Sequence, residues 1–309
     1  MTPGGYHVVG NQILDGNRQP YHFHGVSRPS LEWNPDGESI TERDWDVVKT
    51  WGANVIRLPL NQVFWRTAPL YQLRVQTYVD QIIERGMDVI LDLQWSEGPM
   101  PGTGAQREMA DQQSVVFWSE VATMFKDNSR VLFELYNEPK LVRGGGWEVW
   151  HNGGEVGGFQ AVGMTQLYEA VRAAGAPNIV ILGGIDFGYN LSEVPMRQIP
   201  DAFNVAYSAH PYDFSNKMMP SWEADWGFLA ATHPIIITEF GRAPTSPTPC
   251  DPAYPQQVID YANAKGAGWV AWAWFVKDCT FPSLITDYNG AATEAGEVVK
   301  QALLAYGTN

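Results

Sequence analysis

The stretch Val131-Leu-Phe-Glu-Leu-Tyr-Asn-Glu-Pro139 decides how the rest of the chain is interpreted. Its first half, residues 131–135, is an apolar run typical of a short buried strand, and Pro139 cannot continue a strand ladder. Asn137 and Glu138 therefore stand at the exit of a buried strand. Polar side chains in that position fit a site better than a core, although a solvated Glu after an edge strand is the plain structural alternative.

A second stretch has the same design. Pro234-Ile-Ile-Ile-Thr-Glu239-Phe-Gly241 is an apolar run that ends in one carboxylate and a Gly. Two glutamates at the C-terminal ends of two strands are the usual arrangement for retaining hydrolysis of a glycosidic bond. Each Glu alone is weak evidence, so the interpretation depends on where the two strands lie in the fold.

Strands and helices alternate along the whole chain. Hydrophobic periodicity and turn residues predict eight strands, at residues 21–26, 54–60, 88–95, 131–135, 179–183, 205–210, 234–239 and 268–274. The predicted helices cover residues 41–51, 71–85, 111–126, 158–174, 192–198, 222–231, 255–264 and 293–306. This pattern predicts an α/β fold of the (β/α)8 TIM-barrel type, in which catalytic groups lie at the C-terminal ends of the strands.

We expect one domain over residues 1–309, because no repeat, linker or low-complexity segment interrupts the pattern. Within it, residues 1–20 predict a small β-hairpin around Gly10-Asn11 that caps the bottom of the barrel. The long Gly-rich stretch 140–157 is expected to be a loop.

The amino-acid composition limits the classes of molecule that the protein is expected to bind. The formal net charge of −14 disfavours nucleic acid and anionic membranes, because both would repel the chain. No stretch reaches the roughly 20 apolar residues of a membrane span. The 13 Trp residues exceed what the core needs, and sugar rings are the natural partners of surplus indole faces. We therefore expect a polysaccharide or oligosaccharide substrate. We also expect no cofactor and a monomer.

The two cysteines, Cys250 and Cys279, fall in consecutive loops that follow strands. We favour a disulfide between them over two free thiols. The first residues lack the basic and apolar regions of a signal peptide, so the protein is either cytoplasmic or has had a leader removed. The disulfide favours secretion.

Further polar and aromatic residues lie near predicted strand ends. Arg57 sits inside an apolar strand, where its charge requires a partner, and a carboxylate such as Glu239 would suit it. A structural ion pair lower in the barrel is the alternative for this Arg. The remaining strand-end candidates are His210, Tyr212, Trp272 and Trp274.

His22 and His24 share one face of the first strand. A His-x-His pair there begins the metal site of the metal-dependent amidohydrolases, which is the rival interpretation. Such a site needs more ligands after strands five and eight, but strand five ends in Gly183-Gly184 and strand eight in aromatic residues. We expect no metal, and we retain His24 as a candidate supporting residue of the site.

Five of these features, in this order on these strands, resemble glycoside hydrolase family 5, the cellulase-like clan of (β/α)8 enzymes. They are Arg57 in Ile-Arg-Leu-Pro, Asn137-Glu138-Pro139, His210-x-Tyr212, Glu239-Phe-Gly241 and Trp272. The similarity runs over nearly the whole chain.

The resemblance implies a role for each residue. Glu138 would be the general acid/base and Glu239 the nucleophile. Asn137 would bond the 2-hydroxyl of the sugar, and Arg57 and Tyr212 would orient Glu239. His210 would support the site, and Trp272 would form the floor of the subsite at the cleavage point.

The chain departs from the family at Gln94, where many relatives have His. An amide can bond a sugar hydroxyl but cannot titrate, so Gln94 is expected to contact substrate without moving protons. Loop residues that would shape the cleft, or simply pack, are Arg28, Glu32, Trp33, Trp147 and Trp150.

The sequence therefore predicts a secreted, cofactor-free, retaining endo-β-1,4-glucanase. A β-mannanase or other β-glycanase is the alternative within the family, because one catalytic core serves many substrates. A barrel that binds sugar without cleaving it is the alternative from another class, and a reducing-sugar assay separates it from an enzyme.

Overall fold

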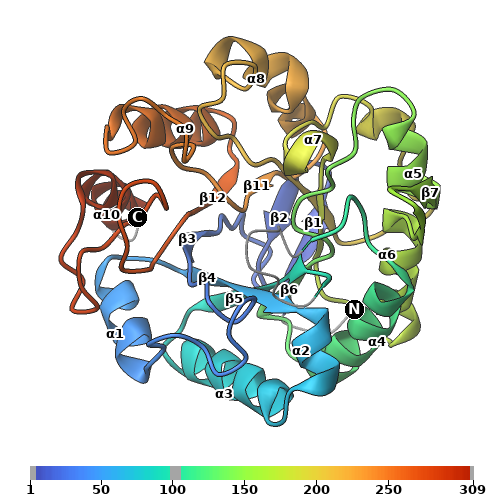
Figure 1. The fold of residues 1–309 in the computed structure, drawn as a ribbon, viewed down its shortest axis with the longest axis horizontal. Helices are drawn as coiled ribbons and strands as arrows, with labels where there is room; N and C mark the ends of the chain where they lie inside the picture. Colours follow the sequence, from blue (N-terminus) through green and yellow to red (C-terminus); the bar gives the residue numbers. More distant parts are fainter. Residues whose placement is uncertain (1–4, 98–105, 307–309) are drawn as a thin grey trace.

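Eight parallel strands form the centre of the molecule, and helices surround them (Figure 1). The structure is a computed structural model that describes residues 5–97 and 106–306. Neighbours in the sheet follow the order β10-β9-β6-β5-β4-β3-β12-β11. The ring closes between β10 and β11, where Tyr207 bridges Ile235 in parallel register and donates a backbone bond of 3.0 Å to Pro234. The strands are β3 (His24–Ser27), β4 (Val55–Asn61), β5 (Asp88–Trp95), β6 (Val131–Glu134), β9 (Val180–Gly183), β10 (Val205–Ser208), β11 (Ile236–Ile237) and β12 (Gly268–Ala271). The predicted TIM barrel is confirmed.

Helices follow the strands in the predicted alternation, with shifted bounds, and short helices at residues 62–67 and 185–188 were not predicted. The helices are α1 (Glu42–Thr50), α2 (Gln62–Thr67), α3 (Tyr71–Glu84), α4 (Gln112–Phe125), α5 (Gly146–Asn152), α6 (Met164–Ala173), α7 (Ile185–Gly188), α8 (Met219–Asp225), α9 (Ala253–Ala264) and α10 (Glu294–Tyr306). Two 3-10 helices, η1 (Val194–Met196) and η2 (Gly227–Ala231), complete the set. None of the helices in these described ranges is long and apolar enough to cross a membrane.

Alternation along each strand divides the residues between two environments. In β4, Ile56 and Leu58 pack outward in the layer between strands and helices, whereas Val55 belongs to a cluster inside the barrel. Arg57, two positions after Val55, therefore also points inward. In β6, Leu132 belongs to the same inner cluster, so Glu134, two positions later, also points into the barrel.

The barrel interior is thus layered. Its lower layer is apolar and consists of Ile13, Phe23, Val55, Ile90, Leu132, Ile179, Ile181, Ala206, Ile236 and Val270. One pleat further along the strands, the buried inward residues are polar: Ser27, Arg57, Asp92, Glu134, Ser208 and Thr238. This second layer lies directly beneath the C-terminal mouth of the barrel.

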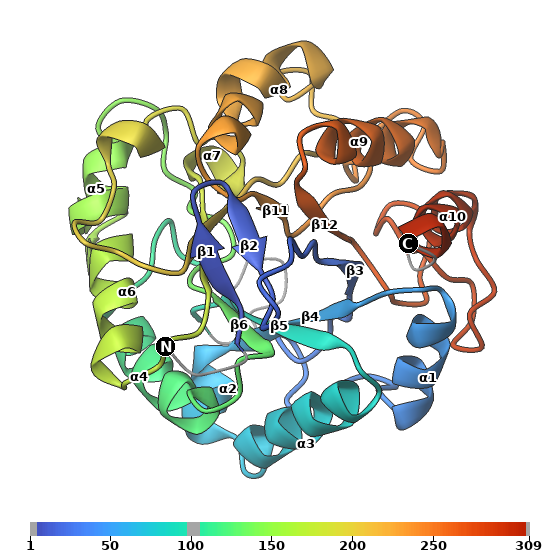
Figure 2. The same ribbon diagram turned by 180° about the vertical axis from the view of Figure 1, so that it is seen from behind.

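A hairpin lies against the opposite end, where the strands begin (Figure 2). Its strands, β1 (His7–Val9) and β2 (Gln12–Leu14), pair in antiparallel register. Ile13 packs into the lower apolar layer. The hydroxyls of Tyr6 and Tyr21 each donate a 2.9 Å hydrogen bond to Asp88 at the start of β5. The hairpin is therefore tied to the barrel by both apolar and polar contacts.

Three predicted segments differ in the structure. In the first, residues 159–161 of the predicted helix 158–174 form a strand, and the helix begins at Met164. Residues 192–198 contain only the short η1, because Pro195 disfavours a longer helix. The predicted loop 140–157 instead contains α5 and the strand β7 (Gly154–Val156), which pairs with β8 (Phe159–Ala161). Trp147 and Trp150 are three positions apart on α5 and are both buried, with ring centroids 5.2 Å apart. Their packing stabilises a helix that its glycines disfavour.

Candidate active site

Arg57 occupies the centre of the polar layer. Its guanidinium donates hydrogen bonds of 2.7 Å to three side chains: Glu134, Asn137 and Glu239. A third acid, Asp92, lies 3.0 Å from the guanidinium. Burial alone would lower the pKa of Arg57, but Asp92, Glu134 and Glu239 raise it, so the side chain remains charged. Arg57 therefore binds the predicted carboxylate, Glu239, and also a second one, Glu134, that was not predicted.

Glu239 is held from both sides. One carboxylate oxygen accepts from Arg57 at 2.7 Å and from the Gln94 amide at 3.4 Å. The other oxygen accepts from the hydroxyl of Tyr212 at 2.8 Å. These donors fix the orientation of the carboxylate at the floor of the mouth, where it is almost fully buried.

Glu138 is more open, with 23% of its side chain exposed. His210 Nδ1 is hydrogen-bonded to a Glu138 carboxylate oxygen at 3.2 Å, and His210 Nε2 to the Thr238 hydroxyl at 2.9 Å. The Thr238 hydroxyl in turn donates to Glu134. A buried chain of polar groups therefore connects Glu138 to the same acid that binds Arg57.

The charges in this chain follow from burial and neighbours. Burial opposes a charged imidazole, but Glu239 and the contacts with Glu134 and Glu138 raise the pKa of His210 to about 10. Burial also opposes ionisation of Glu134, but Arg57 and His210 bring its pKa below the ordinary value. Asp92 is different: burial raises its pKa well above the usual range although Arg57 is near. Neither Asp92 oxygen has an aligned hydrogen-bond donor among the described residues, which explains why burial dominates there.

Glu138 and Glu239 face each other across a short gap. One oxygen of each carboxylate and a ring nitrogen of His210 all lie within 4.8 Å of one another. Three such atoms resemble part of a metal site, but a metal ligand must be a neutral imidazole. Both ring nitrogens of His210 already have protein partners, Glu138 and Thr238, so the ring has no free nitrogen to offer a metal ion.

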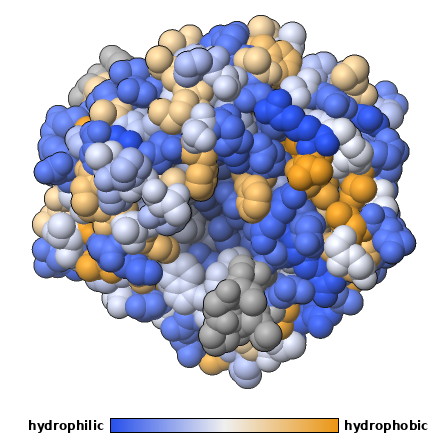
Figure 3. Space-filling model, turned by 45° about the horizontal axis from the view of Figure 1, so that its top comes forward, coloured by the Kyte–Doolittle hydropathy of each residue, from blue (hydrophilic) through white to orange (hydrophobic). Residues whose placement is uncertain are grey.

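The two glutamates line a pocket of about 610 Å³ in the barrel mouth. Figure 3 shows this face of the molecule hollowed near its centre. Trp272 lines the pocket together with Phe281, and the two rings are 5.8 Å apart. Trp33 contacts Phe281 at 6.0 Å and Trp95 at 6.4 Å, so an aromatic wall extends from the pocket across the mouth. The peptide bond between Trp272 and Ala273 is cis.

The model of the cellulase family, glycosyl hydrolase family 5, matches residues 14–278. The chain belongs to this family. An endoglucanase from Clostridium saccharobutylicum is 24% identical, in an alignment that covers 86% of this chain and 56% of that protein. An endoglucanase from Paenibacillus polymyxa is 23% identical, with 87% of this chain and 79% of that protein covered.

Solved structures share the fold of this family 5 chain. A β-glucanase from Saccharophagus degradans, in complex with cellotetraose, superimposes with a TM-score of 0.78 and 23% identity, covering 99% of this chain and 95% of that one. The catalytic domain of the major endoglucanase from Xanthomonas campestris gives a TM-score of 0.72 and 19% identity, covering 97% of this chain and all (100%) of that one.

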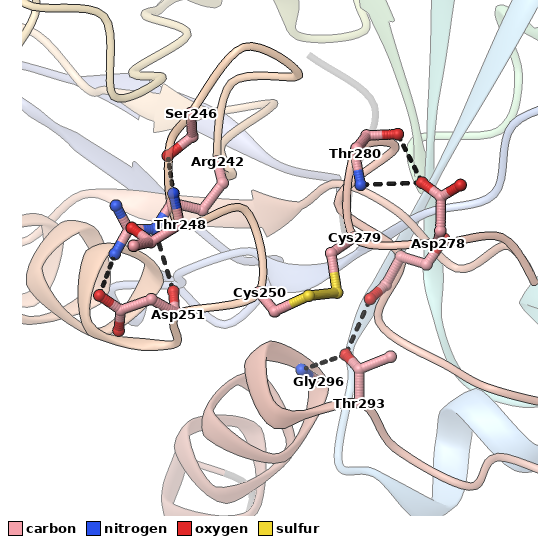
Figure 4. Close-up of a disulfide and its surroundings, with 11 residues drawn as sticks. Arg242, Ser246, Thr248, Cys250, Asp251, Asp278, Cys279, Thr280, Thr293 and Gly296 are labelled. Carbon is pink, nitrogen blue, oxygen red and sulfur yellow. Dashed lines mark hydrogen bonds and ion pairs between the residues drawn. A yellow bond between two sulfur atoms is a disulfide. The ribbon is translucent and has the colours of Figure 1, made fainter.

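The disulfide predicted between Cys250 and Cys279 is confirmed, with a Cα–Cα distance of 5.0 Å (Figure 4). Cys250 lies in the loop after β11, where Arg242 binds Asp213 at 2.8 Å and Asp251 at 2.5 Å. Cys279 immediately precedes Thr280 and Phe281, which line the pocket. The bond therefore ties one wall of the pocket to a loop that ion pairs already fix.

The structure does not bring His24 into the site, and that prediction is corrected. His24 alternates with Phe23, whose side chain is inside the barrel, so His24 points outward. Its ring lies 4.9 Å from Trp269 and 4.2 Å from Tyr306 of α10. Burial lowers its pKa to about 3, which is the behaviour of a neutral core residue.

Several loop candidates also pack away from the pocket. Trp147 and Trp150 are buried beneath the surface, and Trp150 donates to the Gly183 carbonyl at 2.8 Å. Arg28 is buried against Asp44 at 3.5 Å and bonds the Glu38 carbonyl. Glu32 is buried and accepts from the Ser30 amide at 2.7 Å. Of the loop candidates, Trp33 alone contacts the aromatic wall.

Sequence reasoning missed Asp92, Glu134 and Thr238 as parts of the site. Glu134 and Asp92 each stand within an apolar strand that was interpreted by its apolar residues alone. The signal was available: both are inward by alternation from residues of the apolar layer, Leu132 and Ile90. A carboxylate inside a barrel strand requires a cation, as Arg57 required an acid.

Proposed function

We propose that the chain is a retaining endo-β-1,4-glucanase that cleaves neutral β-linked glucans by double displacement. The observation that carries the proposal is the short gap between the Glu138 and Glu239 carboxylates, whose nearest oxygens are within 4.8 Å. Retaining glycosidases place their two carboxyl groups about 5–5.5 Å apart, whereas inverting ones leave about 6.5–9.5 Å for a water molecule.

In the first step Glu239 attacks the anomeric carbon, and the bond from that carbon to the leaving oxygen breaks. Glu138 gives its proton to the leaving oxygen. In the second step Glu138 takes a proton from water, whose oxygen displaces Glu239 from the anomeric carbon. One glycosidic bond of the glucan is hydrolysed. The two successive inversions at the anomeric carbon leave the new reducing end in the β configuration.

The surrounding residues support these roles. Arg57 and Tyr212 hold the two oxygens of Glu239 so that one of them faces the sugar. Asn137 uses its carbonyl oxygen on Arg57 and one amide hydrogen on Gln106, which leaves the second amide hydrogen for the 2-hydroxyl of the sugar. Trp272 supplies an apolar ring for the sugar at the cleavage point.

The disulfide fits an oxidising compartment, and we therefore propose that the protein acts outside the cell. We also propose that it acts as a monomer. The relatives named endoglucanase are longer than the part that aligns here, so their activity is evidence for the proposal and not a property of this chain.

The test is hydrolysis of a soluble β-1,4-glucan, followed from the first minutes by proton NMR. We expect the β-anomer of the new reducing end to appear first and mutarotation to follow. A mannan and a mixed-linkage glucan in parallel would identify the preferred sugar. Initial α-anomer would contradict the retaining mechanism, and no release from any of the three polymers would contradict the assignment as a glycanase.

A further inference from the structure

A second cavity lies beside the disulfide, and the proposed reaction does not use it. Its volume is about 250 Å³, and its apolar lining includes Phe240, Pro255, Leu284 and Val299. We propose that this cavity is a binding site for a small neutral aromatic alcohol, of which phenol is the simplest example. The inference does not rest on the proposed function, because it concerns a different cavity and is tested by binding alone.

The cavity and the pocket of the barrel mouth share part of a wall. Trp272 and Pro282 line both of them, whereas the two catalytic glutamates line the mouth pocket and not the cavity. Cys250 and Cys279 belong to the lining of the cavity. Figure 4 shows the start of α10 beside this disulfide, and residues of that helix line the cavity as well. A ligand bound here would therefore lie outside the catalytic pocket but next to its Trp272 wall.

One buried hydroxyl group of the cavity lacks a partner. Ser283 lines the cavity and is only 2% exposed, yet its Oγ has no hydrogen-bond partner among residues 5–97 and 106–306. Leaving a buried polar group unpaired costs free energy, so such a group on the wall of a cavity indicates a ligand that pairs with it. A serine hydroxyl can donate one hydrogen bond and accept others, which suits a single hydroxyl on the ligand.

The first turn of α10 is the other polar feature of the cavity, because residues 293–295 line it. This end of the helix is fixed to the segment that carries Ser283. Thr293 N donates to the Leu284 carbonyl at 2.9 Å, and Thr293 Oγ1 donates to the Ser283 carbonyl at 2.8 Å. A Cβ at position 296 would collide with the Leu284 carbonyl, so Gly296 permits this close approach. The positive end of the helix dipole favours an electron-rich ligand oxygen near Ser283.

The rest of the lining limits the class of ligand. A sugar carries several hydroxyls, and most of them would lack partners among apolar side chains. A carboxylate would need a free cation, but Arg242, which lines the cavity, already binds Asp213 at 2.8 Å and Asp251 at 2.5 Å. Glu294, also in the lining, would repel it. An apolar cavity of about 150 Å³ accommodates benzene, so this cavity has room for one six-membered ring. A neutral aromatic ring with one hydroxyl meets all of these conditions.

The experiment titrates the whole chain with para-fluorophenol and follows binding by fluorine NMR. We expect saturable binding with a Kd of about 1 mM or tighter, which a ligand of this size can reach. Ala295→Phe places a ring in the cavity and should raise Kd by about tenfold or more, because a filled cavity has no room for the ligand. Ala264→Phe is the matched control, since Ala264 is an exposed residue of α9 outside the cavity. Its Kd should stay within about twofold of that of the unaltered chain.

Ser283→Ala tests the contribution of the hydroxyl. It should raise the Kd of para-fluorophenol by about fivefold, equivalent to one hydrogen bond, and leave that of fluorobenzene within about twofold. Fluorobenzene has the same ring but no hydroxyl. The Ser283 Oγ has no partner among the described residues, so its removal breaks no hydrogen bond within that part of the chain. This variant therefore tests the site even if Ala295→Phe does not fold.

Several outcomes would overturn the inference. One is the absence of saturable binding, and another is binding that Ala295→Phe leaves unchanged, which would place the ligand outside the cavity. Equal effects of Ser283→Ala on para-fluorophenol and fluorobenzene would show that the hydroxyl does not pair with Ser283. Tighter binding of para-fluorobenzoate than of para-fluorophenol would contradict the neutral class. Because binding needs no hydrolysis, a chain that binds para-fluorophenol as expected but cleaves no glucan would contradict the proposed function alone.

Discussion

Arg57 is the residue on which the geometry of both glutamates depends. It binds Glu239 directly, and it reaches Glu138 through Glu134, Thr238 and His210. A single guanidinium therefore fixes the nucleophile and the acid/base in one frame, because its planar donors leave little rotational freedom. This arrangement leads to distinct expectations for the two glutamates.

Removing each carboxylate should give a different kinetic result. Glu239→Ala should reduce kcat by about a thousandfold or more on every substrate, since the first step requires the nucleophile. Glu138→Ala should retain much of the first step with a dinitrophenyl cellobioside, whose leaving group needs no proton, and then stall. Added azide should restore turnover and yield the β-glycosyl azide, measured by mass spectrometry and NMR. Full activity of Glu239→Ala would show that the wrong site has been chosen.

Gln94 tests the one departure from the family pattern. Its amide donates weakly to Glu239 at 3.4 Å, while its carbonyl oxygen is buried without a hydrogen-bond partner among the described residues. A sugar hydroxyl would satisfy that oxygen, so Gln94→Ala should raise KM by about tenfold, equivalent to one lost hydrogen bond. The pH–rate profile should keep its shape, because an amide does not titrate. A shift of either limb by more than about one pH unit would contradict this.

The predicted residues differ in how well the sequence could place them. Arg57, Asn137, Glu138, Tyr212 and Glu239 were placed by their position at strand ends. His24 was not, because period two shows that His22 and His24 share a face but not which face it is. In a barrel both faces of a strand are buried, so polarity does not mark the inside. The position of the neighbouring Phe23 in the lower apolar layer shows that His22 and His24 are on the outer face of the strand.

Among the elements, the loop after β12 links stability to substrate binding. The disulfide closes 29 residues and precedes the pocket residues Thr280 and Phe281. Replacing both cysteines with Ser should reduce the free energy of unfolding by roughly 3–4 kcal/mol in the chain-entropy model. Because the wall that contacts Trp272 is then less constrained, KM should rise more than kcat falls. Denaturant titration and steady-state kinetics measure the two effects.

Ser246→Ala is the control for that pair. Ser246 lies in the loop after β11, which carries Cys250, and the variant removes its 2.7 Å hydrogen bond to Asp213 while leaving the disulfide intact. It should cost about 1 kcal/mol and leave KM unchanged. Equal KM values for the cysteine variant and the unaltered enzyme would show that the disulfide does not position the wall.

Element prediction failed where tertiary contacts override local preference. The glycines between residues 144 and 154 predict a loop, yet α5 forms because two Trp side chains on one face are buried together. The turn at Asp186 and Phe187 has no sequence signal either, because neither residue type favours positive φ as Gly does. Bonds to residues 139 and 141, distant in sequence, hold it. Such contacts are invisible to local periodicity.

For the whole molecule, the buried ionisable groups predict how stability depends on pH. Neighbouring carboxylates raise the pKa of His210 to about 10 against the effect of burial, and burial raises the pKa of Glu32 to about 8. Both groups bind a proton more tightly in the folded than in the unfolded chain. Their contributions are therefore present at lower pH and are lost as pH rises through the folded pKa values. His24 acts in the opposite direction: its pKa is lowered to about 3, so its contribution is lost as pH falls below about 6.5.

Above about pH 6.5, where histidines in the unfolded chain no longer bind protons, the free energy of unfolding should therefore fall up to about pH 10. Chemical denaturation at pH 6, 8 and 10 measures this slope. Glu32→Gln should flatten the slope up to about pH 8, and His210→Gln the slope between about pH 6.5 and 10, because each variant removes one group whose pKa is raised. Asp92, whose pKa burial also raises, contributes in the same direction in both variants. His233→Gln is the control, since burial lowers the pKa of His233 and its contribution has the opposite sign. An unfolding free energy that rises from pH 6 to pH 9 would mean that His210 is neutral in the folded enzyme, and the hydrogen bond to Glu138 would then be made by an uncharged ring.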